Sequence, residues 1–266
     1  MSIVTTIAYQ QAQSAQDHVV KTEKAITVFD GHGDDDVIDA CREMDPVLFE
    51  QEPNNYINTL EQKISRVDSS GCGATFAGVR TFLDSSGQTM IDLYWIGDSY
   101  IGVYDDEGNL LFKTNTAKKI DPRIEVNYVS DELNMSVRGE KDIGLEIDHY
   151  WHFPKGETMN MTESLGHQNV AYLGMHHHQL PLTDSLKIIL ATDGFWDMTY
   201  DGDLSFLADP DNQADELLQF VVDRWSQEWN YDPNPPGEDK FSLQQSQIPL
   251  DQWDDIAIGV IQLTSA

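Results

Sequence analysis

Three aspartates share one local setting, the end or the start of a short apolar run. Asp30 and Asp193 each follow such a run and precede a glycine, and Asp254 stands just before the last apolar run of the chain. Carboxylates held at strand ends suit hard cations such as Mg²⁺ or Mn²⁺, which take oxygen ligands. A glycine after the acid lets the backbone approach a ligand and offers its carbonyl oxygen. The pattern indicates a metal site assembled from distant parts of the chain.

A fourth aspartate and a histidine strengthen this interpretation. Asp98 lies in the tight turn Gly97-Asp98-Ser99, and His32 follows Asp30 by two residues. The alternative is that Asp-Gly is only a common turn pair, which is the better interpretation of any one of these positions alone. The four aspartates and His32 together favour a site.

The elements that must position these residues begin with short strands. Residues 25–29 are β-rich and end at a glycine-containing break, and the acids at 34–36 precede a helix start. Tyr56, Ile57, Leu60, Ile64 and Val67 fall on one helical face. Residues 73–113 alternate apolar runs with turn formers, which predicts a meander of antiparallel strands.

The second half of the chain gives a less regular pattern. Residues 114–185 show few clean periods and carry no element assignment. We expect a buried strand at 187–191, an amphipathic helix from Asp215 to Trp229, a loop at 230–239, and a last strand from Ile256 to Leu263. Strands and helices come in blocks, which favours an antiparallel α+β arrangement in a single domain, residues 1–266.

The sequence resembles the metal-dependent serine/threonine protein phosphatases, the protein phosphatase 2C or PPM family. The resemblance covers nearly the whole chain and implies a four-layer α/β/β/α sandwich with two central antiparallel sheets. The blocks that carry it, in order, are Val28-Phe-Asp-Gly-His-Gly33, Ser70-Gly-Cys-Gly-Ala-Thr75, Ile96-Gly-Asp-Ser99, Leu190-Ala-Thr-Asp-Gly-Phe-Trp-Asp197 and Asp254-Asp-Ile256.

The resemblance also implies a metal arrangement. Asp30 bridges two Mg²⁺ or Mn²⁺ ions and the carbonyl of Gly31 ligates one of them, while Asp193 and Asp254 hold the other. Asp98 with Asp193 would serve a third, weaker site. Two neighbouring cations lower the pKa of a bridging water, so that hydroxide attacks phosphorus in line near neutral pH. His32 would protonate the leaving oxygen as general acid, and its alternative role is a structural histidine in the turn.

The sequence departs from the family near its N-terminus. The family usually has Arg-x-x-x-Glu-Asp there, where the arginine binds phosphate and the acids support the metals. Here Asp17 is kept, but Gln16 replaces the glutamate and Ala12 the arginine. Phosphate binding would then need another base, such as Lys21 or Lys24.

Smaller departures occur elsewhere. Asp34 replaces a second glycine after His32-Gly33, His167 stands where a Ser-x-x-Leu-Gly-Asp block has aspartate, and Asp255 replaces the common asparagine. Two other candidates lie outside these blocks. His176-His177-His178 are interpreted as surface loop residues rather than a metal set. Cys72 is interpreted as a small buried thiol rather than a nucleophile.

Composition limits the possible partners. The chain has 266 residues and a net charge of −30, which repels nucleic acid and anionic membranes and attracts divalent cations. No apolar stretch is long enough to span a bilayer, and no signal sequence is visible at the N-terminus. Two cysteines do not form a disulfide framework. We expect a cytoplasmic monomer with neither nucleic-acid nor membrane partners.

The function we expect is hydrolysis of phosphoserine and phosphothreonine in proteins. The alternative, kept open by Ala12 and Gln16, is a pseudophosphatase that acts as a binding or regulatory module. A phosphatase of small phosphate esters is a third interpretation, because substrate choice would lie in the unassigned residues 114–185.

Overall fold

The computed structural model describes most of the chain, with gaps. Residues 2–12, 14–69, 71–114, 164–166, 174–199, 202–226 and 254–264 are described with their side chains, and residues 127–130, 135–138, 149–152, 158–159, 201, 228–231 and 241–247 by their backbone.

The first of two central sheets has six strands, all paired antiparallel. Its order is β13-β5-β4-β3-β2, and β12 pairs with one end of β4. The strands are β2 (His18–Lys21), β3 (Ala25–His32), β4 (Gly73–Leu83), β5 (Thr89–Ile96), β12 (Leu165–Gly166) and β13 (His176–Pro181).

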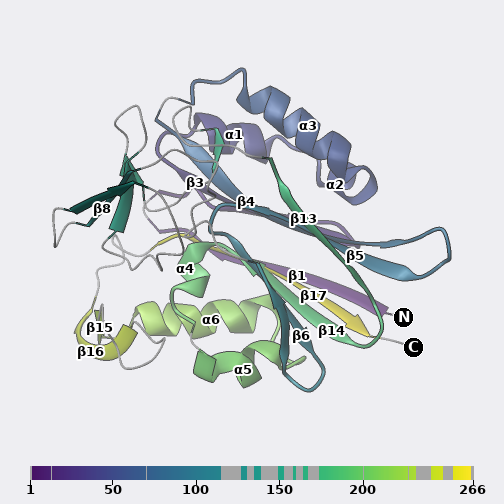
Figure 1. The fold of residues 1–266 in the computed structure, drawn as a ribbon. Helices are drawn as coiled ribbons and strands as arrows, with labels where there is room; N and C mark the ends of the chain where they lie inside the picture. The colour runs from purple at the N-terminus through teal and green to yellow at the C-terminus, as the bar shows by residue number, and fades with distance from the viewer. Residues whose placement is uncertain are drawn as a thin grey trace.

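The second sheet has five strands in the order β1-β17-β14-β6-β7, again antiparallel. Its strands are β1 (Ser2–Gln10), β6 (Tyr100–Asp105), β7 (Leu110–Lys113), β14 (Leu186–Ala191) and β17 (Ile256–Thr264). The first and last strands of the chain lie side by side along their whole length, with Ser2 opposite Thr264 and Gln10 opposite Ile256 (Figure 1).

Helices cover the outer face of each sheet (Figure 1). The six-stranded sheet is covered by α1 (Asp36–Arg42), α2 (Pro46–Gln51) and α3 (Pro53–Ile64). The five-stranded sheet is covered by α4 (Asp193–Trp196), the 3₁₀ turn η1 (Asp201–Asp203), α5 (Leu204–Ala208) and α6 (Ala214–Trp225). The expected α+β fold, with two antiparallel sheets between helical layers, is confirmed.

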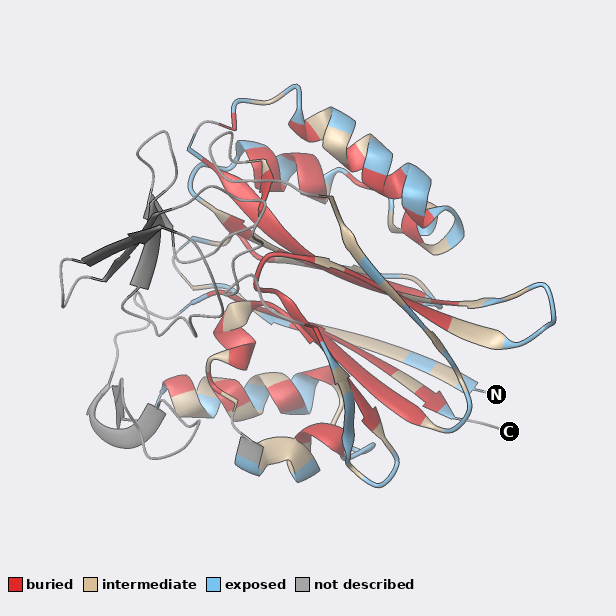
Figure 2. Cartoon of the chain, viewed as in Figure 1, coloured by how far each residue is buried: buried red, intermediate tan, exposed pale blue. Residues whose placement is uncertain are grey.

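Strand periodicity explains the layers. In β3, Ile26 and Val28 point between the sheets, whereas Phe29 points toward the helices and packs on Phe76, with ring centroids 5.0 Å apart. The same alternation in β14 sends Ile188 inward and Ile189 toward α6. Buried residues therefore form three clusters, one between the sheets and one under each helical layer (Figure 2).

Among the described strands, two smaller sheets do not pair with either sheet of the sandwich. One has the order β11-β10-β8-β9, and the other pairs β15 with β16. Their strands are β8 (Asn127–Ser130), β9 (Met135–Arg138), β10 (His149–His152), β11 (Thr158–Met159), β15 (Glu228–Tyr231) and β16 (Phe241–Gln247). Strands β8 to β11 show that residues 114–185 contain more regular structure than the sequence pattern indicated.

Several expected boundaries were wrong. The helix expected to run to Trp229 ends at Trp225, and β15 takes up Trp229 and the first residues of the expected loop. Residues 232–239 of that loop lie outside the described residues. Val67 follows the end of α3, although it still packs against the core. Among the described residues, no helix has the length and apolarity needed to cross a bilayer.

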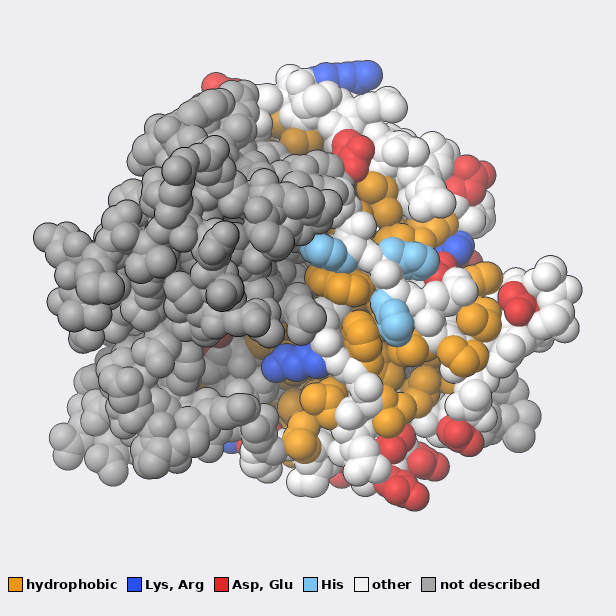
Figure 3. Space-filling view, in the orientation of Figure 1, with side chains coloured by type: hydrophobic (Ala, Val, Ile, Leu, Met, Phe, Trp, Pro, Cys, Tyr) orange, Lys and Arg blue, Asp and Glu red, His pale blue; other side chains and the backbone are white. Residues whose placement is uncertain are grey.

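The three consecutive histidines lie on strand β13 rather than on a loop. His176 and His178 stack on Trp95 and Phe112, with ring centroids 5.4 Å and 4.7 Å apart, whereas His177 stacks on Tyr94. Histidine side chains accordingly gather with apolar ones on one face of the molecule (Figure 3). Their rings are committed to aromatic stacking along a sheet edge.

Candidate metal centre

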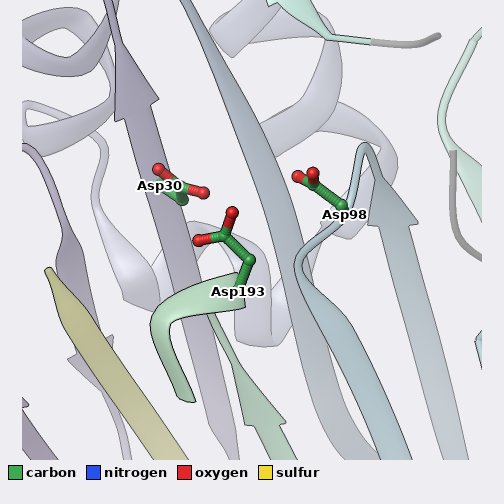
Figure 4. Close-up of side chains that lie close together, drawn as sticks. All are labelled: Asp30, Asp98 and Asp193. Carbon is green, nitrogen blue, oxygen red and sulfur yellow. The ribbon is translucent and has the colours of Figure 1, made fainter. Parts of the chain in front are cut away.

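Three carboxylates converge at one end of the sandwich. Asp30 lies near the end of β3, Asp98 in the turn between β5 and β6, and Asp193 at the first position of α4, directly after β14 and Thr192. One oxygen from each lies within 4.8 Å of the others, and Figure 4 shows the three side chains directed into a common space. The sequence named Asp30, Asp193 and Asp254 as the principal ligands and Asp98 as a fourth. The structure brings Asp30, Asp98 and Asp193 together, and Asp254 is not a member of this set of three.

Electrostatics reveal how closely these acids are packed. Burial raises the pKa of Asp30 well above its usual range, and repulsion from Asp193, Asp17 and Asp98 adds to the rise. Burial likewise raises the pKa of Asp193, followed by repulsion from Asp254 and Asp98. Each of the aspartates selected from the sequence therefore belongs to one mutually repelling group.

Asp17 enters this group from the loop between β1 and β2. It is buried, and desolvation raises its pKa while a hydrogen bond with Thr192 lowers it. Its Oδ2 atom is buried without a hydrogen-bond partner among the described residues. A buried carboxylate oxygen in this state is costly unless a cation or a donor reaches it.

Asp254 lies at the exposed rim of the group. Desolvation and repulsion from Asp197 raise the pKa of Asp254 to about 6, whereas the hydrogen bond from the Asp255 amide to its Oδ1, 2.9 Å long, opposes the rise. Asp254 is not among the three carboxylates within 4.8 Å of one another, so its role differs geometrically from that of Asp98.

These residues pass a chemical test for divalent cations. The donor set is entirely oxygen, which Mg²⁺ and Mn²⁺ prefer. The acids repel one another strongly, and Asp17 holds an unpartnered oxygen. A cation between the carboxylates would reduce their repulsion and give the buried Asp17 oxygen a partner.

Two glycines allow the close backbone contacts on which the site depends. A Cβ on Gly194 would lie 2.2 Å from the Asp255 carbonyl oxygen, so α4 packs directly against the residues before β17. A Cβ on Gly31 would lie 2.8 Å from the Cβ of Ile38 and 3.0 Å from the Gln16 carbonyl oxygen. The Asp-Gly pairs are therefore required by packing as well as by turn geometry.

His32 sits beyond Asp30 on the same face of β3 and contacts a serine. Its Nε2 lies 3.2 Å from Oγ of Ser164, a fully buried residue beside β12. Gly73 of β4 lies under this pair, since a Cβ there would come within 2.5 Å of both atoms. The glycine thus makes room for the histidine–serine contact.

The loop that precedes Asp17 is fixed by several hydrogen bonds. Asp255, 2% exposed, accepts hydrogen bonds from the amides of Ala12 and Gln16 and from the Ser14 hydroxyl. The Gln16 side chain donates to the Gly33 carbonyl, 2.6 Å away, and to Oδ1 of Asp35 at 3.0 Å. Gln16 therefore takes a structural position at the site.

The basic residues suggested as substitutes for the missing arginine do not reach the site in this structure. Nζ of Lys21 donates to the Thr5 carbonyl at the far end of β2. Arg42 approaches the loop instead, because its guanidinium donates to the Ala15 carbonyl. Ala15 has φ of 52°, an uncommon conformation for a residue with a side chain.

Cys72 is a buried thiol, as expected. Its Sγ donates to the Asp68 carbonyl at 3.2 Å, and burial raises its pKa, which disfavours the thiolate. His167, another position at which the sequence departs from the family pattern, lies outside the described residues.

Sequence reasoning missed three residues of the site. Asp197 is the strongest charged neighbour of Asp254, Asp255 holds the loop before Asp17, and Ser164 contacts His32. The spacing of Asp197, four residues after Asp193 across a helix start, was a usable signal. The loop contacts of Asp255 had none, since they join residues more than 230 positions apart.

Comparison with known proteins places the fold. No family model matches the sequence, and no curated protein matches it. Solved structures match over the full length: the serine/threonine phosphatase PstP/Ppp of Mycobacterium tuberculosis shares 14% identity, covers 100% of both chains and gives a TM-score of 0.58. The PPM Ser-Thr phosphatase MsPP of Mycobacterium smegmatis shares 13% identity over 98% of this chain and 99% of that one, with a TM-score of 0.55.

A third match was solved with metal. The catalytic domain of PstP in complex with two manganese ions shares 14% identity over 99% of this chain and 100% of that one, with a TM-score of 0.55. The fold of the present chain is therefore that of the PPM serine/threonine phosphatases.

Proposed function

We propose that this protein is a metal-dependent phosphatase acting on phosphoserine and phosphothreonine in proteins. The observation that carries the proposal is the convergence of Asp30, Asp98 and Asp193, whose carboxylate oxygens lie within 4.8 Å of one another. A mutually repelling group of buried acids is costly for folding. Its presence at one end of a phosphatase-like fold supports a catalytic rather than a structural role.

The proposed ligand assignment uses the described oxygens. Asp30 would be shared by two cations, the Gly31 carbonyl and Asp17 would help to hold one of them, and Asp193 with Asp254 would hold the other. Asp98, together with Asp193, would hold a third and weaker cation. When bound, Mg²⁺ or Mn²⁺ supplies Lewis-acid polarisation of the phosphoryl group and lowers the pKa of water.

The bound cations would supply charge compensation, and the chain itself supplies a proton. A phosphate ester approaching a protein of net charge −30 needs local positive charge, which a metal-loaded carboxylate group provides. His32 delivers a proton to the leaving serine or threonine oxygen, and Ser164, 3.2 Å from its Nε2, holds the ring in place. The half-buried position of His32 suits a group that meets substrate at a site rim.

The relatives in fold support this class of reaction. The printed names of PstP and MsPP describe serine/threonine phosphatases, and one PstP structure holds two manganese ions. The proposal extends that activity and that metal chemistry to the present chain, on the strength of its own aspartates.

One specific observation favours a second candidate, a pseudophosphatase that binds phosphoproteins without turnover. Ala12 stands where the resemblance implies a phosphate-binding arginine, and its backbone amide is used by Asp255 instead. Loss of that arginine weakens phosphate binding but leaves the metal ligands intact.

A matched set of assays separates these candidates. Hydrolysis of p-nitrophenyl phosphate and of a phosphothreonine peptide is measured with Mn²⁺ and with chelator, for the natural chain and for Asp30→Asn and Asp193→Asn. Asp215→Asn, an exposed acid in the first turn of α6, is the control. We expect Mn²⁺-dependent release of phosphate from both substrates, lost in the two site variants and kept in the control.

The other outcomes are equally informative. Mn²⁺ binding with no turnover on any substrate favours the pseudophosphatase. Turnover of the aryl ester with none on phosphopeptides favours a small-molecule phosphatase. Activity that persists in chelator or in Asp30→Asn contradicts the metal mechanism.

A further inference from the structure

A cavity of about 230 Å³ opens at the end of the five-stranded sheet remote from the carboxylates. Lys187 lies near the start of β14, and Asp193 follows the other end of the same strand. Asp193 is six positions further along the chain, which corresponds to about 20 Å in extended backbone. Its lining includes Leu186, Lys187 and Leu263, together with Asp105, Asp106 and Thr264.

Lys187 is the unusual feature of this cavity. It is 3% exposed, and its stem lies on the face of β14 that packs toward α5 and α6. Its Nζ donates to the Asp209 carbonyl, 2.6 Å away, which is its one hydrogen-bond partner among the described residues. A lysine ammonium has three donors, so two of its N–H positions remain for a group in the cavity.

The surroundings decide what such a group can be. The cavity wall carries Asp105 and Asp106, and Asp209 and Glu216 lie close enough to affect the amine. Asp105 is already engaged by the Asn109 amide and side chain at 2.7 Å and 2.9 Å. Two acids near the amine and two on the cavity wall, in a protein of net charge −30, disfavour anionic ligands. A small neutral molecule fits this environment.

We propose that Lys187 condenses reversibly with small neutral aldehydes that enter this cavity. The lone pair of Nζ attacks the carbonyl carbon to form a carbinolamine. Loss of water then gives the imine, because the C–O bond breaks as the C=N bond forms. The oxygen leaves as water and carries the two protons that were on the amine nitrogen. The reaction needs no oxidant or reductant.

Size sets the range of aldehydes. A water molecule takes about 30 Å³ of liquid volume, so a cavity of about 230 Å³ accommodates on the order of seven or eight heavy atoms. Aliphatic aldehydes of three to six carbons therefore fit, whereas a polycyclic aromatic aldehyde does not.

Burial also prepares the amine for this reaction. Desolvation lowers the pKa of Lys187 to about 8, although Asp209 and Glu216 oppose the change. At pH 7 about one amine in ten is then neutral, against fewer than one in a thousand for an exposed lysine with a pKa near 10.4. Only the neutral amine attacks a carbonyl.

The test uses propanal as the probe on the full chain at pH 7, with sodium cyanoborohydride to reduce any imine to a stable propyl-lysine. Peptide mapping by mass spectrometry compares Lys187 with Lys63, whose Nζ forms a surface ion pair with Glu43. We expect Lys187 to be alkylated at least ten-fold faster than Lys63. Alkylation of Lys187 at the same rate as Lys63, or more slowly, overturns the proposal.

Two further measurements keep the result specific to the cavity. Thr264→Trp narrows the mouth without touching the core, and it should slow alkylation of Lys187 at least five-fold while leaving Lys63 unchanged. Pyrenecarboxaldehyde should label Lys63 and spare Lys187. Equal labelling of Lys187 in the Thr264→Trp variant, or by the large aldehyde, would show that the cavity plays no part.

Discussion

The Gln16 amide donates a hydrogen bond to Oδ2 of Asp255 at 2.8 Å, and joins the loop before Asp17 to the residue before β17. Ala12 and Ser14 donate to the same carboxylate. Because Asp17 directly follows this loop and Asp254 directly precedes Asp255, one side chain holds two proposed metal-supporting residues in register.

Asp255→Ala should weaken both the fold and the metal site. Hydrogen bonds to a charged group contribute about 1.5–3 kcal/mol each, so we expect the free energy of unfolding to fall by about 3 kcal/mol or more. We also expect a higher Mn²⁺ concentration for half-maximal binding. Urea unfolding and calorimetric Mn²⁺ titration measure the two effects.

Asp255→Asn is the matched variant, since it keeps the side-chain shape with one acceptor oxygen. Asp255→Asn should lower the free energy of unfolding and the Mn²⁺ affinity less than Asp255→Ala does. Equal Mn²⁺ affinity in all three proteins would show that the loop contacts do not position the site.

The metal-free protein should lose stability as the pH rises. Asp30, Asp193 and Asp254 have a raised pKa in the folded state, to about 6 for Asp254, so the folded chain binds more protons than the unfolded chain. The stability associated with Asp254 is therefore present below pH 4 and is lost as the pH rises from about 4 to 6. In chelator, Tm should be lower at pH 7.5 than at pH 5.

Two comparisons check the origin of this dependence. Saturating Mn²⁺ should restore Tm at pH 7.5, because the cations replace the protons that relieve the repulsion. Asp193→Asn should raise Tm in chelator at pH 7.5. A Tm in chelator that is insensitive to the Asp193→Asn substitution would mean that the carboxylates do not repel one another in solution.

Gly194→Ala should be strongly destabilising, because its Cβ would lie 2.2 Å from the Asp255 carbonyl oxygen. Overpacking of this kind costs about 1–3 kcal/mol or more. Gly202→Ala is the control, since nothing lies within 4 Å of a Cβ there. Thermal unfolding of the two variants should separate them clearly, and equal Tm values would contradict the packing of α4 against Asp255, just before β17.

His32→Gln should distinguish substrates by their leaving groups. A serine or threonine alkoxide needs a proton to leave, whereas nitrophenolate does not, so the loss should approach about 10²-fold or more on a phosphopeptide and be much smaller on p-nitrophenyl phosphate. Steady-state kinetics on both substrates provide the comparison. An equal loss on both would assign His32 a structural role.

The sequence was informative where a local pattern, such as a strand end or a turn, also fixes where a residue lies in the fold. The buried apolar runs before the two Asp-Gly pairs indicated strands that bring Asp30 and Asp193 to one end of the sandwich, although β3 continues to His32 and β14 already ends at Ala191. Turn residues at regular spacing predicted the strands β4 to β7, and β4 pairs with β5 and β6 with β7 as antiparallel hairpins. The expected continuous meander was wrong, because β5 and β6 lie in different sheets and the chain crosses between them at the turn that holds Asp98.

Other features depend on contacts that no local pattern records. β1 alternates only weakly, and its place beside β17 is set by pairing with the opposite end of the chain. The end of α6 at Trp225 was missed because Trp229 continued the helical period, although it belongs to β15. The buried contacts of Lys187 and Asp255 likewise depend on segments far away in sequence.

The most direct test of the central claim is an anomalous difference map from crystals soaked in Mn²⁺. We predict strong anomalous peaks between the carboxylates of Asp30, Asp98 and Asp193. At least one of these peaks should be absent from the Asp30→Asn variant. If the protein keeps the described fold and a saturating Mn²⁺ soak leaves this space without an anomalous peak, the proposed metal site is contradicted.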